Sequence, residues 1–188
     1  MAGRDVIEVL THDHREVEQL FTELEPMIGT GAAQAGEERT EKVIVELVRH
    51  SVAEEEYLYP LVRDALSGGN ELADREIAEH SQAEQIMKRL EQLSPDNVEF
   101  GTELRALMDV VRRHVAEEEG ELFPQLRQAC TTEQLHDLGE KVEEAKKTAP
   151  TRPHPSSPST PPANKLLGPG VAIVDRIRDL LSGRSKHH

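Results

Sequence analysis

The chain has 188 residues, of which 36% are apolar and 31% charged, and its formal net charge is −14. This length allows one domain with its own core and an appended segment. The acidic balance argues against a general nucleic-acid binder, which needs a basic surface to meet phosphates. No apolar run approaches the roughly 20 residues of a membrane span, and the first residues lack the apolar stretch of a signal peptide. We therefore expect a cytoplasmic protein that has no membrane span and binds no nucleic acid.

Four stretches of the chain predict amphipathic helices, because their apolar residues recur at steps of three and four. The inner positions run from Ile7 to Leu24, from Val43 to Leu61, from Ile77 to Leu90 and from Leu104 to Leu126. Segments rich in Gly, Pro, Asn and Ser separate these stretches, namely MIGTGAAQAG, SGGN and SPDN. Short links imply antiparallel neighbours, so the sequence predicts an all-α protein built on an up-down-up-down four-helix bundle.

A fifth helix is expected after residue 130, where Thr131 or Thr132 can cap its first turn. We assign residues 1–148 to the bundle with this fifth helix. Residues 149–170 are expected to be a linker, because their prolines remove backbone donors and fix φ. Residues 171–188 contain VAIVDRIRDLLSGRSK, which predicts a short amphipathic basic helix in this acidic chain. This tail helix either packs back on the bundle or mediates a dimer.

Each bundle helix carries a histidine followed four residues later by a glutamate on its inner face. The pairs are His14/Glu18, His50/Glu54, His80/Glu84 and His114/Glu118. Residues four apart share a helix face, so both side chains can reach one cation or two adjacent ones. One such pair is typical of a solvated helix surface, but four pairs in register with the apolar positions favour a metal site. A lone ionised carboxylate in a core is costly, so these groups need partners.

The second and fourth helices repeat one another. HSVAEEEYLYP, starting at His50, aligns without a gap with HVAEEEGELFP, starting at His114, and HREVEQL in the first helix echoes HSQAEQI in the third. The chain thus reads as a duplicated helical hairpin, whose pseudo-twofold axis would bring the four pairs to one level. Pro60 and Pro124 each lack the N–H that bonds the residue four earlier, so we expect both helices to kink just beyond the site.

The types of ligand narrow the range of metals that could bind. Imidazole and carboxylate without thiolate suit iron, manganese and similar ions, and six or more ligands indicate two metals. The Glu-x-x-His motif of ferritin-like di-iron bundles occurs only at Glu133/His136, outside the four-helix core. Tyr57 lies one turn beyond Glu54 on the same face, where it would either bind a metal as phenolate or donate a hydrogen bond beside it.

The quoted motifs resemble the hemerythrin-like family of HHE cation-binding domains, over approximately residues 1–145. The resemblance implies two iron ions in an oxo- or hydroxo-bridged di-iron centre inside the bundle. Carried onto this chain, the ligands would be His14, His50, Glu54, His80, His114 and Glu118. Oxygen-carrying hemerythrins have a histidine at the position of Glu84, and a carboxylate there should favour ferric iron and weaken reversible oxygen binding. We include Glu84 among the candidate ligands, with Tyr57 and Glu18 as ligands or groups beside them.

The same resemblance favours redox chemistry on a small oxidant, namely peroxide, nitric oxide or dioxygen, in oxidative or nitrosative stress defence. The chain has no nucleophile-base motif, phosphate-binding loop or dinucleotide fingerprint that would indicate another chemistry. Peroxide disproportionation, or nitric oxide removal with peroxide, would make the protein a catalase- or peroxidase-like oxidoreductase. The alternative is an oxygen or iron sensor without turnover, whose tail helix reports the metal state.

Overall fold

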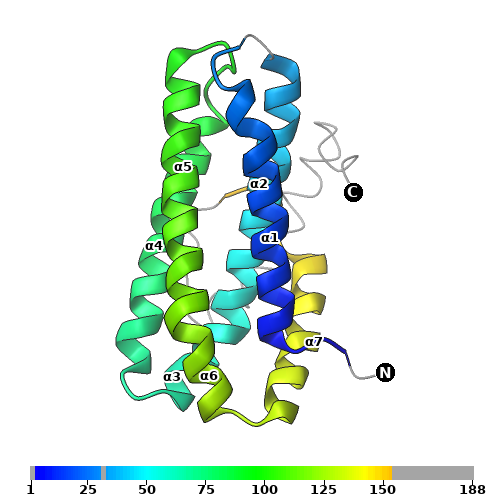
Figure 1. Cartoon of the computed structure of the whole chain (residues 1–188), viewed down its shortest axis with the longest axis vertical. Coiled ribbons are helices and arrows are strands. Elements are labelled where there is room, and N and C mark those ends of the chain that lie inside the picture. The colour runs from blue at the N-terminus through cyan, green and yellow to red at the C-terminus, as the bar shows by residue number, and fades with distance from the viewer. Residues whose placement is uncertain (1–2, 31–32, 154–188) are drawn as a thin grey trace.

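The computed structural model describes residues 3–30 and 33–153, and the regular structure in this part of the chain is helical throughout (Figure 1). Successive long helices run in opposite directions, which confirms the predicted up-down-up-down bundle with a fifth helix. The predicted helix within residues 171–188 lies outside the described residues. Among the described helices, none is both long and apolar enough to cross a bilayer.

Helix α1 (Val6–Leu24) begins at a reciprocal cap. The Asp5 carboxylate accepts a hydrogen bond from the Glu8 backbone N–H at 2.9 Å, and the Glu8 carboxylate accepts one from the Asp5 N–H at 3.0 Å. This exchange satisfies two N–H groups that a helix start otherwise leaves unpaired. The helix then tightens into a 3₁₀ turn, η1 (Glu25–Met27), which contains Pro26.

The second and fourth bundle helices each contain one π-helical turn. In the second, α2 (Ala33–Ala53) and α3 (Tyr59–Ala65) flank the π segment η2 (Glu54–Leu58). In the fourth, α5 (Val98–Glu117) and α6 (Phe123–Ala129) flank the π segment η3 (Glu118–Leu122).

The two π turns lie directly before Pro60 and Pro124, where we expected the helices to kink. The Tyr59 N–H bonds the Glu54 carbonyl, and the Phe123 N–H bonds the Glu118 carbonyl. Each bond spans five residues, so the turn takes up one extra residue before the proline that lacks a donor. The helix is therefore widened at this point, and both segments continue with a proline in the first turn of the next α-helix.

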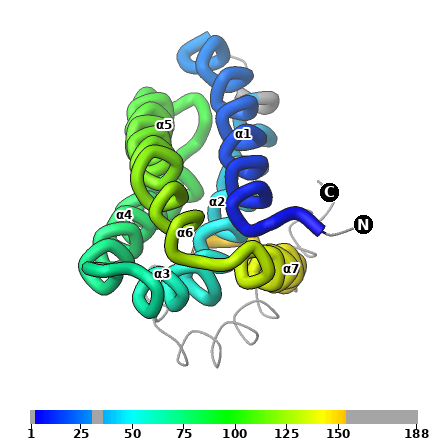
Figure 2. The backbone as a smooth tube through the Cα atoms, turned by 60° about the horizontal axis from the view of Figure 1, so that its bottom comes forward, coloured from blue at the N-terminus to red at the C-terminus, as the bar shows by residue number. Residues whose placement is uncertain are grey.

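A tight turn leads into the third bundle helix, α4 (Gly69–Leu90). Gly68 has a left-handed backbone with φ of 74°, which favours glycine. A side chain at Gly69 would overlap the Val62 carbonyl, so α3 and α4 meet with their backbones in close approach. The fifth helix, α7 (Thr132–Thr148), starts with a capping box between Thr131 and Gln134, as the sequence indicated. Figure 2 shows α7 beside the first turns of α1.

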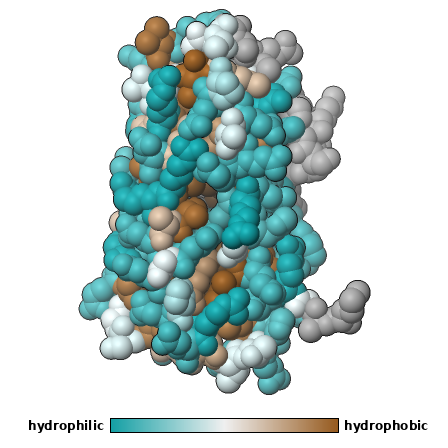
Figure 3. All heavy atoms as spheres, viewed as in Figure 1, coloured by the Kyte–Doolittle hydropathy of each residue, from teal (hydrophilic) through white to brown (hydrophobic). Residues whose placement is uncertain are grey.

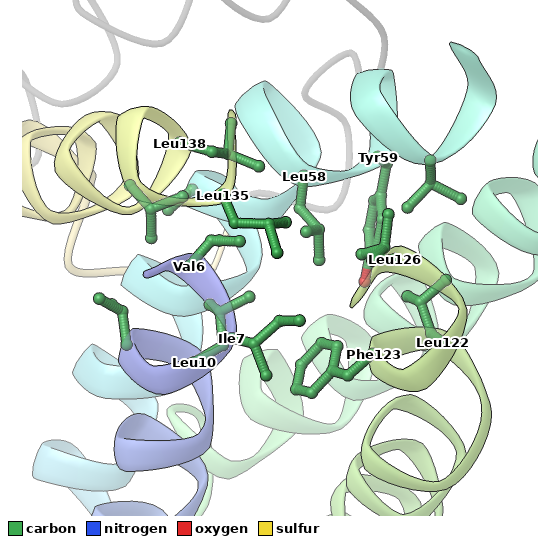
Figure 4. Close-up of a cluster of buried hydrophobic side chains, with 14 of the residues drawn as sticks. Val6, Ile7, Leu10, Leu58, Tyr59, Leu122, Phe123, Leu126, Leu135 and Leu138 are labelled. Atoms are coloured by element: carbon green, nitrogen blue, oxygen red, sulfur yellow. The ribbon is translucent and has the colours of Figure 1, made fainter. Parts of the chain in front are cut away.

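The core consists of two apolar clusters with a polar layer between them. One cluster joins the start of α1 to α3, α6 and α7, and Figure 4 shows its side chains pointing toward a common centre. The other joins the later part of α1 to α2, α4 and α5. Between them lie fully or nearly buried histidines and carboxylates, such as His14, Glu54 and Glu118. Hydrophilic residues cover most of the face shown in Figure 3. Charged groups are thus found both on that surface and across the centre of the core.

Candidate metal centre

Four buried histidines, one from each bundle helix, form two close pairs. The Nε2 atoms of His14 and His50 lie 3.3 Å apart, and those of His80 and His114 lie 3.2 Å apart. Each of the four residues is no more than 6% exposed. At this separation the two nitrogens of a pair are close enough to bind one cation, and imidazole nitrogen is a common metal ligand.

Glu54 and Glu118 each contact both histidine pairs. Glu54 places one oxygen 3.1 Å from His50 Nε2 and the other 3.3 Å from His80 Nε2. One oxygen of Glu118 lies 3.4 Å from His14 Nε2 and 3.6 Å from His114 Nε2. Both glutamates are completely buried. The six side chains therefore form two groups of donors that share their carboxylates.

The donor set fits two cations. Glu54 Oε1 and Glu118 Oε2 are buried and make no well-aligned hydrogen bond, although each faces a histidine Nε2 at 3.1–3.6 Å and an ionised carboxylate in a core needs a compensating partner. Both residues belong to clusters in which one donor atom from each member lies within 4.8 Å of the others. Imidazole and carboxylate donors without a thiolate suit iron, manganese or zinc. The predicted ligands His14, His50, Glu54, His80, His114 and Glu118 are therefore brought together.

The electrostatics of the metal-free site follow from its carboxylates. Burial alone lowers the pKa of His50, but Glu54 and Asp13 outweigh it and raise the pKa to about 10. For Glu54, burial alone raises the pKa, but His50 and His80 outweigh it and hold the pKa well below its usual range. Positive charge is thus favoured at this point of the core, whether it is carried by imidazolium or by a bound cation.

A ring of outer carboxylates holds the other nitrogen of each histidine. The Nδ1 atom of His14 lies 2.9 Å from Glu119, and that of His80 lies 3.1 Å from Glu55. In the same way, His50 Nδ1 lies 3.4 Å from Asp13, and His114 Nδ1 lies 3.2 Å from Glu79 and 3.0 Å from Glu76. A carboxylate that accepts the Nδ1–H leaves Nε2 free to bind metal and fixes the ring orientation.

Tyr59, and not Tyr57, reaches the centre of the site. Its hydroxyl lies 3.2 Å from Glu118 Oε1, 3.4 Å from Glu54 Oε2 and 3.2 Å from His80 Nε2. In a regular α-helix a residue advances about 100°, so Tyr57 would lie near Glu54 and Tyr59 would face away. The π turn accommodates one extra residue and turns Tyr59 inward instead. Tyr57 is only partly buried and packs against the apolar cluster.

Glu76 is a buried group of the site that the sequence reading missed. It is completely buried, it forms a cluster with His114 and Glu118, and its Oε2 atom lies 3.0 Å from His114 Nδ1. Its Oε1 atom accepts a hydrogen bond from Arg75 at 3.1 Å. Glu76 lies four residues before His80 and hence on the same helix face, so a search for acidic residues on both sides of each histidine would have found it.

Two predicted site residues lie outside these clusters. Glu18 pairs with Arg112 through two hydrogen bonds of 2.7 Å and 2.9 Å on the surface. Glu84 is partly buried, and within the described part of the chain it belongs to no group of donors close enough to share a cation. The fourfold His-x-x-x-Glu pattern therefore supplies both its members to the site only in the second and fourth helices.

A model of the family described as Hemerythrin HHE cation binding domain matches residues 3–126. The chain belongs to this hemerythrin HHE family. Its HHE domain holds the buried histidine and glutamate clusters described above, and domains of this family bind metal cations.

Individual relatives agree with the hemerythrin assignment. An uncharacterised hemerythrin-like protein of Schizosaccharomyces pombe is 31% identical over 137 residues, which are 72% of this chain and 68% of that protein. A solved hemerythrin HHE domain protein of Mycobacterium kansasii has a TM-score of 0.64 at 24% identity, covering 77% of this chain and 86% of that one, which supports the fold.

A protein named DNA nickase from a Nostoc species is also similar to this hemerythrin-like chain. It is 33% identical over 144 residues, which are 76% of this chain. The match spans only 39% of the nickase, so most of that protein has no counterpart here. What the two chains share is thus of the size of the hemerythrin-like bundle.

Proposed function

We propose that this hemerythrin-like protein holds two iron ions and carries out redox chemistry on a small oxidant. The observation that supports the proposal most directly is that Glu54 and Glu118 each contact both histidine pairs. Two ions held by such shared carboxylates would supply paired one-electron redox steps and a place for a small oxidant. His14, His50 and the two carboxylates would hold one ion, and His80, His114 and the same carboxylates the other.

Tyr59 supports proton-coupled chemistry at this site. Burial raises the pKa of its phenol well above the usual value, and the surrounding carboxylates Glu118 and Glu54 raise it further. The hydroxyl therefore keeps its proton at neutral pH, at an atom that lies among the ligands. We infer that Tyr59 holds a hydrogen bond to the oxidant and orients it.

A small cavity beside the histidines favours a small substrate. It measures about 30 Å³, and its walls include His14, His50, His80 and His114 together with Val17, Leu47, Ala83, Val110 and Val111. A water molecule needs about 10–15 Å³ of such space, so the cavity has room for about two water-sized atoms. Peroxide, nitric oxide and dioxygen are molecules of this size.

Peroxide is the oxidant that needs no further reactant. Two molecules of hydrogen peroxide give two of water and one of dioxygen, so one is reduced and the other oxidised, and atoms and electrons balance. The apolar walls of the cavity would limit the access of water, and the Nδ1 partners of the histidines would keep the rings in place while the Tyr59 hydroxyl donates a hydrogen bond to the oxidant.

Metal analysis and stopped-flow mixing test this proposal. Purified protein should contain about two irons per chain, and the iron-loaded protein mixed with peroxide should release dioxygen and change its absorption rapidly. Protein that takes up no iron contradicts the metal centre. Protein that holds iron but leaves peroxide and nitric oxide unchanged favours the alternative of an oxygen or iron sensor without turnover. That alternative rests on the charge contrast between the acidic bundle and residues 151–188, where six basic residues oppose two acidic ones.

A further inference from the structure

A lysine of the fifth helix is linked to a candidate metal ligand through one carboxylate. The Nζ atom of Lys146 donates to Asp13 Oδ1 at 2.6 Å, and Asp13 Oδ2 lies 3.4 Å from His50 Nδ1. Asp13 is 7% exposed, and the Lys146 side chain is 19% exposed. A short charged hydrogen bond to a nearly buried carboxylate is geometrically specific, so it fixes which oxygen Asp13 turns toward His50.

The lysine comes from outside the matched hemerythrin domain. The family match ends at residue 126, whereas α7 begins at Thr132. The four bundle helices thus supply the histidines and the shared carboxylates, but the cation that anchors Asp13 is supplied by the additional helix.

Close packing holds α7 in the position that this contact needs. Gly139 lies so close to α1 that an added Cβ would overlap the carbonyl oxygen of Arg4. Arg4 also donates to Glu143 at 3.0 Å, and Leu135, Leu138, Val142 and Ala145 of α7 are buried in the apolar cluster shown in Figure 4. Since this face is fixed along its length, the backbone that carries Lys146 is fixed as well.

The pseudo-twofold relation shows that an anchored carboxylate occurs in both halves of the site. Asp13 precedes His14 as Glu79 precedes His80, and each contacts the Nδ1 atom of the histidine in the next bundle helix, His50 and His114 respectively. Glu79 is held by Arg113, at 3.3 Å, from the bundle itself. In the other half the corresponding cation is Lys146, and it comes from α7.

We propose that α7 completes the metal centre, with Lys146 as a positioning residue that acts through Asp13 on His50. The inference rests on the proposed metal site. The lysine holds the carboxylate, the carboxylate holds Nδ1, and the imidazole thereby keeps Nε2 aimed at the shared ligands. Removal of an outer group of this kind commonly lowers metal affinity 10- to 100-fold.

The test measures how fast iron-loaded full-length protein releases iron to an excess of a chelator. Lys146→Gln should release iron about tenfold faster than the wild type. The matched control is Lys147→Gln, because Lys147 is the next residue, is 67% exposed and pairs with Glu144 within α7. Lys146→Arg keeps the positive charge and should retain iron nearly as well as the wild type. It provides the test if Lys146→Gln proves unstable.

A double-mutant cycle separates positioning from general destabilisation. In an Asp13→Asn background, Lys146→Gln should accelerate release no further, because the group through which it acts is already changed. Three outcomes would overturn the inference. They are additive effects of the two substitutions in the cycle, equal rates of iron release by Lys146→Gln and Lys147→Gln, or a wild-type rate of iron release by Lys146→Gln. A wild-type protein that never retains iron would instead refute the proposed metal centre, so the two failures are distinguishable.

Discussion

The two halves of the candidate metal centre share Glu54 and Glu118, and each has two histidines of its own. The halves differ in the residues that surround these ligands. In the half with His14 and His50, the Phe123 ring stacks on His14 at a centroid distance of 5.8 Å. In the half with His80 and His114, the equivalent residue is Tyr59, whose hydroxyl reaches His80. We call them the Phe123 half and the Tyr59 half.

A second pair of equivalent positions differs in the same direction. Four residues before His14 lies Leu10, which is buried in the apolar cluster, whereas four residues before His80 lies the buried carboxylate Glu76. Both differences make the Tyr59 half more polar. A repeated hairpin can thus keep a symmetric set of candidate ligands while the groups beside them are more polar in one half than in the other.

Removal of a ligand should have the largest effect and should affect both halves. His50→Ala removes one donor from the Phe123 half and a contact of the shared Glu54. We expect iron affinity to fall more than about 100-fold, beyond the effect of an outer group. Metal analysis after gel filtration measures this. His12→Ala is the matched control, because the His12 side chain is 52% exposed, and a similar loss of iron in that variant would contradict the assignment.

Exchange of the two aromatic residues tests the difference between the halves directly. Tyr59→Phe should leave the iron content unchanged and slow peroxide turnover about 100-fold, because the site loses the hydroxyl that donates to the oxidant. Phe123→Tyr should change turnover little. In the double exchange, activity should stay low, since Glu76 is present in only one half. Equal effects of the two single variants on turnover would show that the halves are equivalent.

The pH dependence of the metal-free protein tests the charge balance of the Phe123 half. The folded-state pKa of His50 is raised from 6.5 to about 10. Its contribution to stability is therefore fully present below pH 6.5 and is lost as the pH rises through about 10. Thermal unfolding of metal-free protein should occur at progressively lower temperature across this range, with a weaker trend in His50→Gln. A flat wild-type profile would contradict the raised pKa.

A smaller effect is expected from Gly139→Ala, which acts on the Phe123 half from a distance. The added Cβ would overlap the Arg4 carbonyl and push α7 away from α1, at a cost of about 1–3 kcal/mol in unfolding free energy. Iron release should accelerate modestly, because Lys146 moves with the helix. Chemical denaturation and chelator competition measure the two effects. Gly36→Ala is the control, because a Cβ there meets no atom within 4 Å.

Much of the architecture could be predicted from helical periodicity. The apolar stripes predict four helices. The histidines lie in register with these stripes, so they are predicted to face the core and to mark the position of the site along the bundle. Periodicity also separates His14 from His12, because two residues in a helix lie about 200° apart and cannot share one face, and the His12 side chain is half exposed. For six of the seven metal ligands assigned from the sequence, the structure brings the side chains together.

The remaining site residues depend on features that periodicity does not contain. Extrapolation at 3.6 residues per turn selects Tyr57, because nothing in that calculation allows for a π turn before Pro60. The His-x-x-x-Glu pattern predicts the same role for Glu18 as for Glu54, but Glu18 forms an ion pair with Arg112 at the surface. Lys146 joins the site through a contact between residues 133 positions apart, which only the packing of α7 creates.

The paired π turns also bear on how the molecule arose. A π turn behaves as a single residue inserted into an α-helix, and here the insertion occurs at the same step after the histidine in both copies of the hairpin. If the two hairpins arose by duplication, as their matching motifs predict, the ancestral hairpin already carried the insertion. Tyrosine and phenylalanine would then be later alternatives at one inherited position, and reconstruction of the ancestral hairpin as a symmetric dimer would reveal which of them came first.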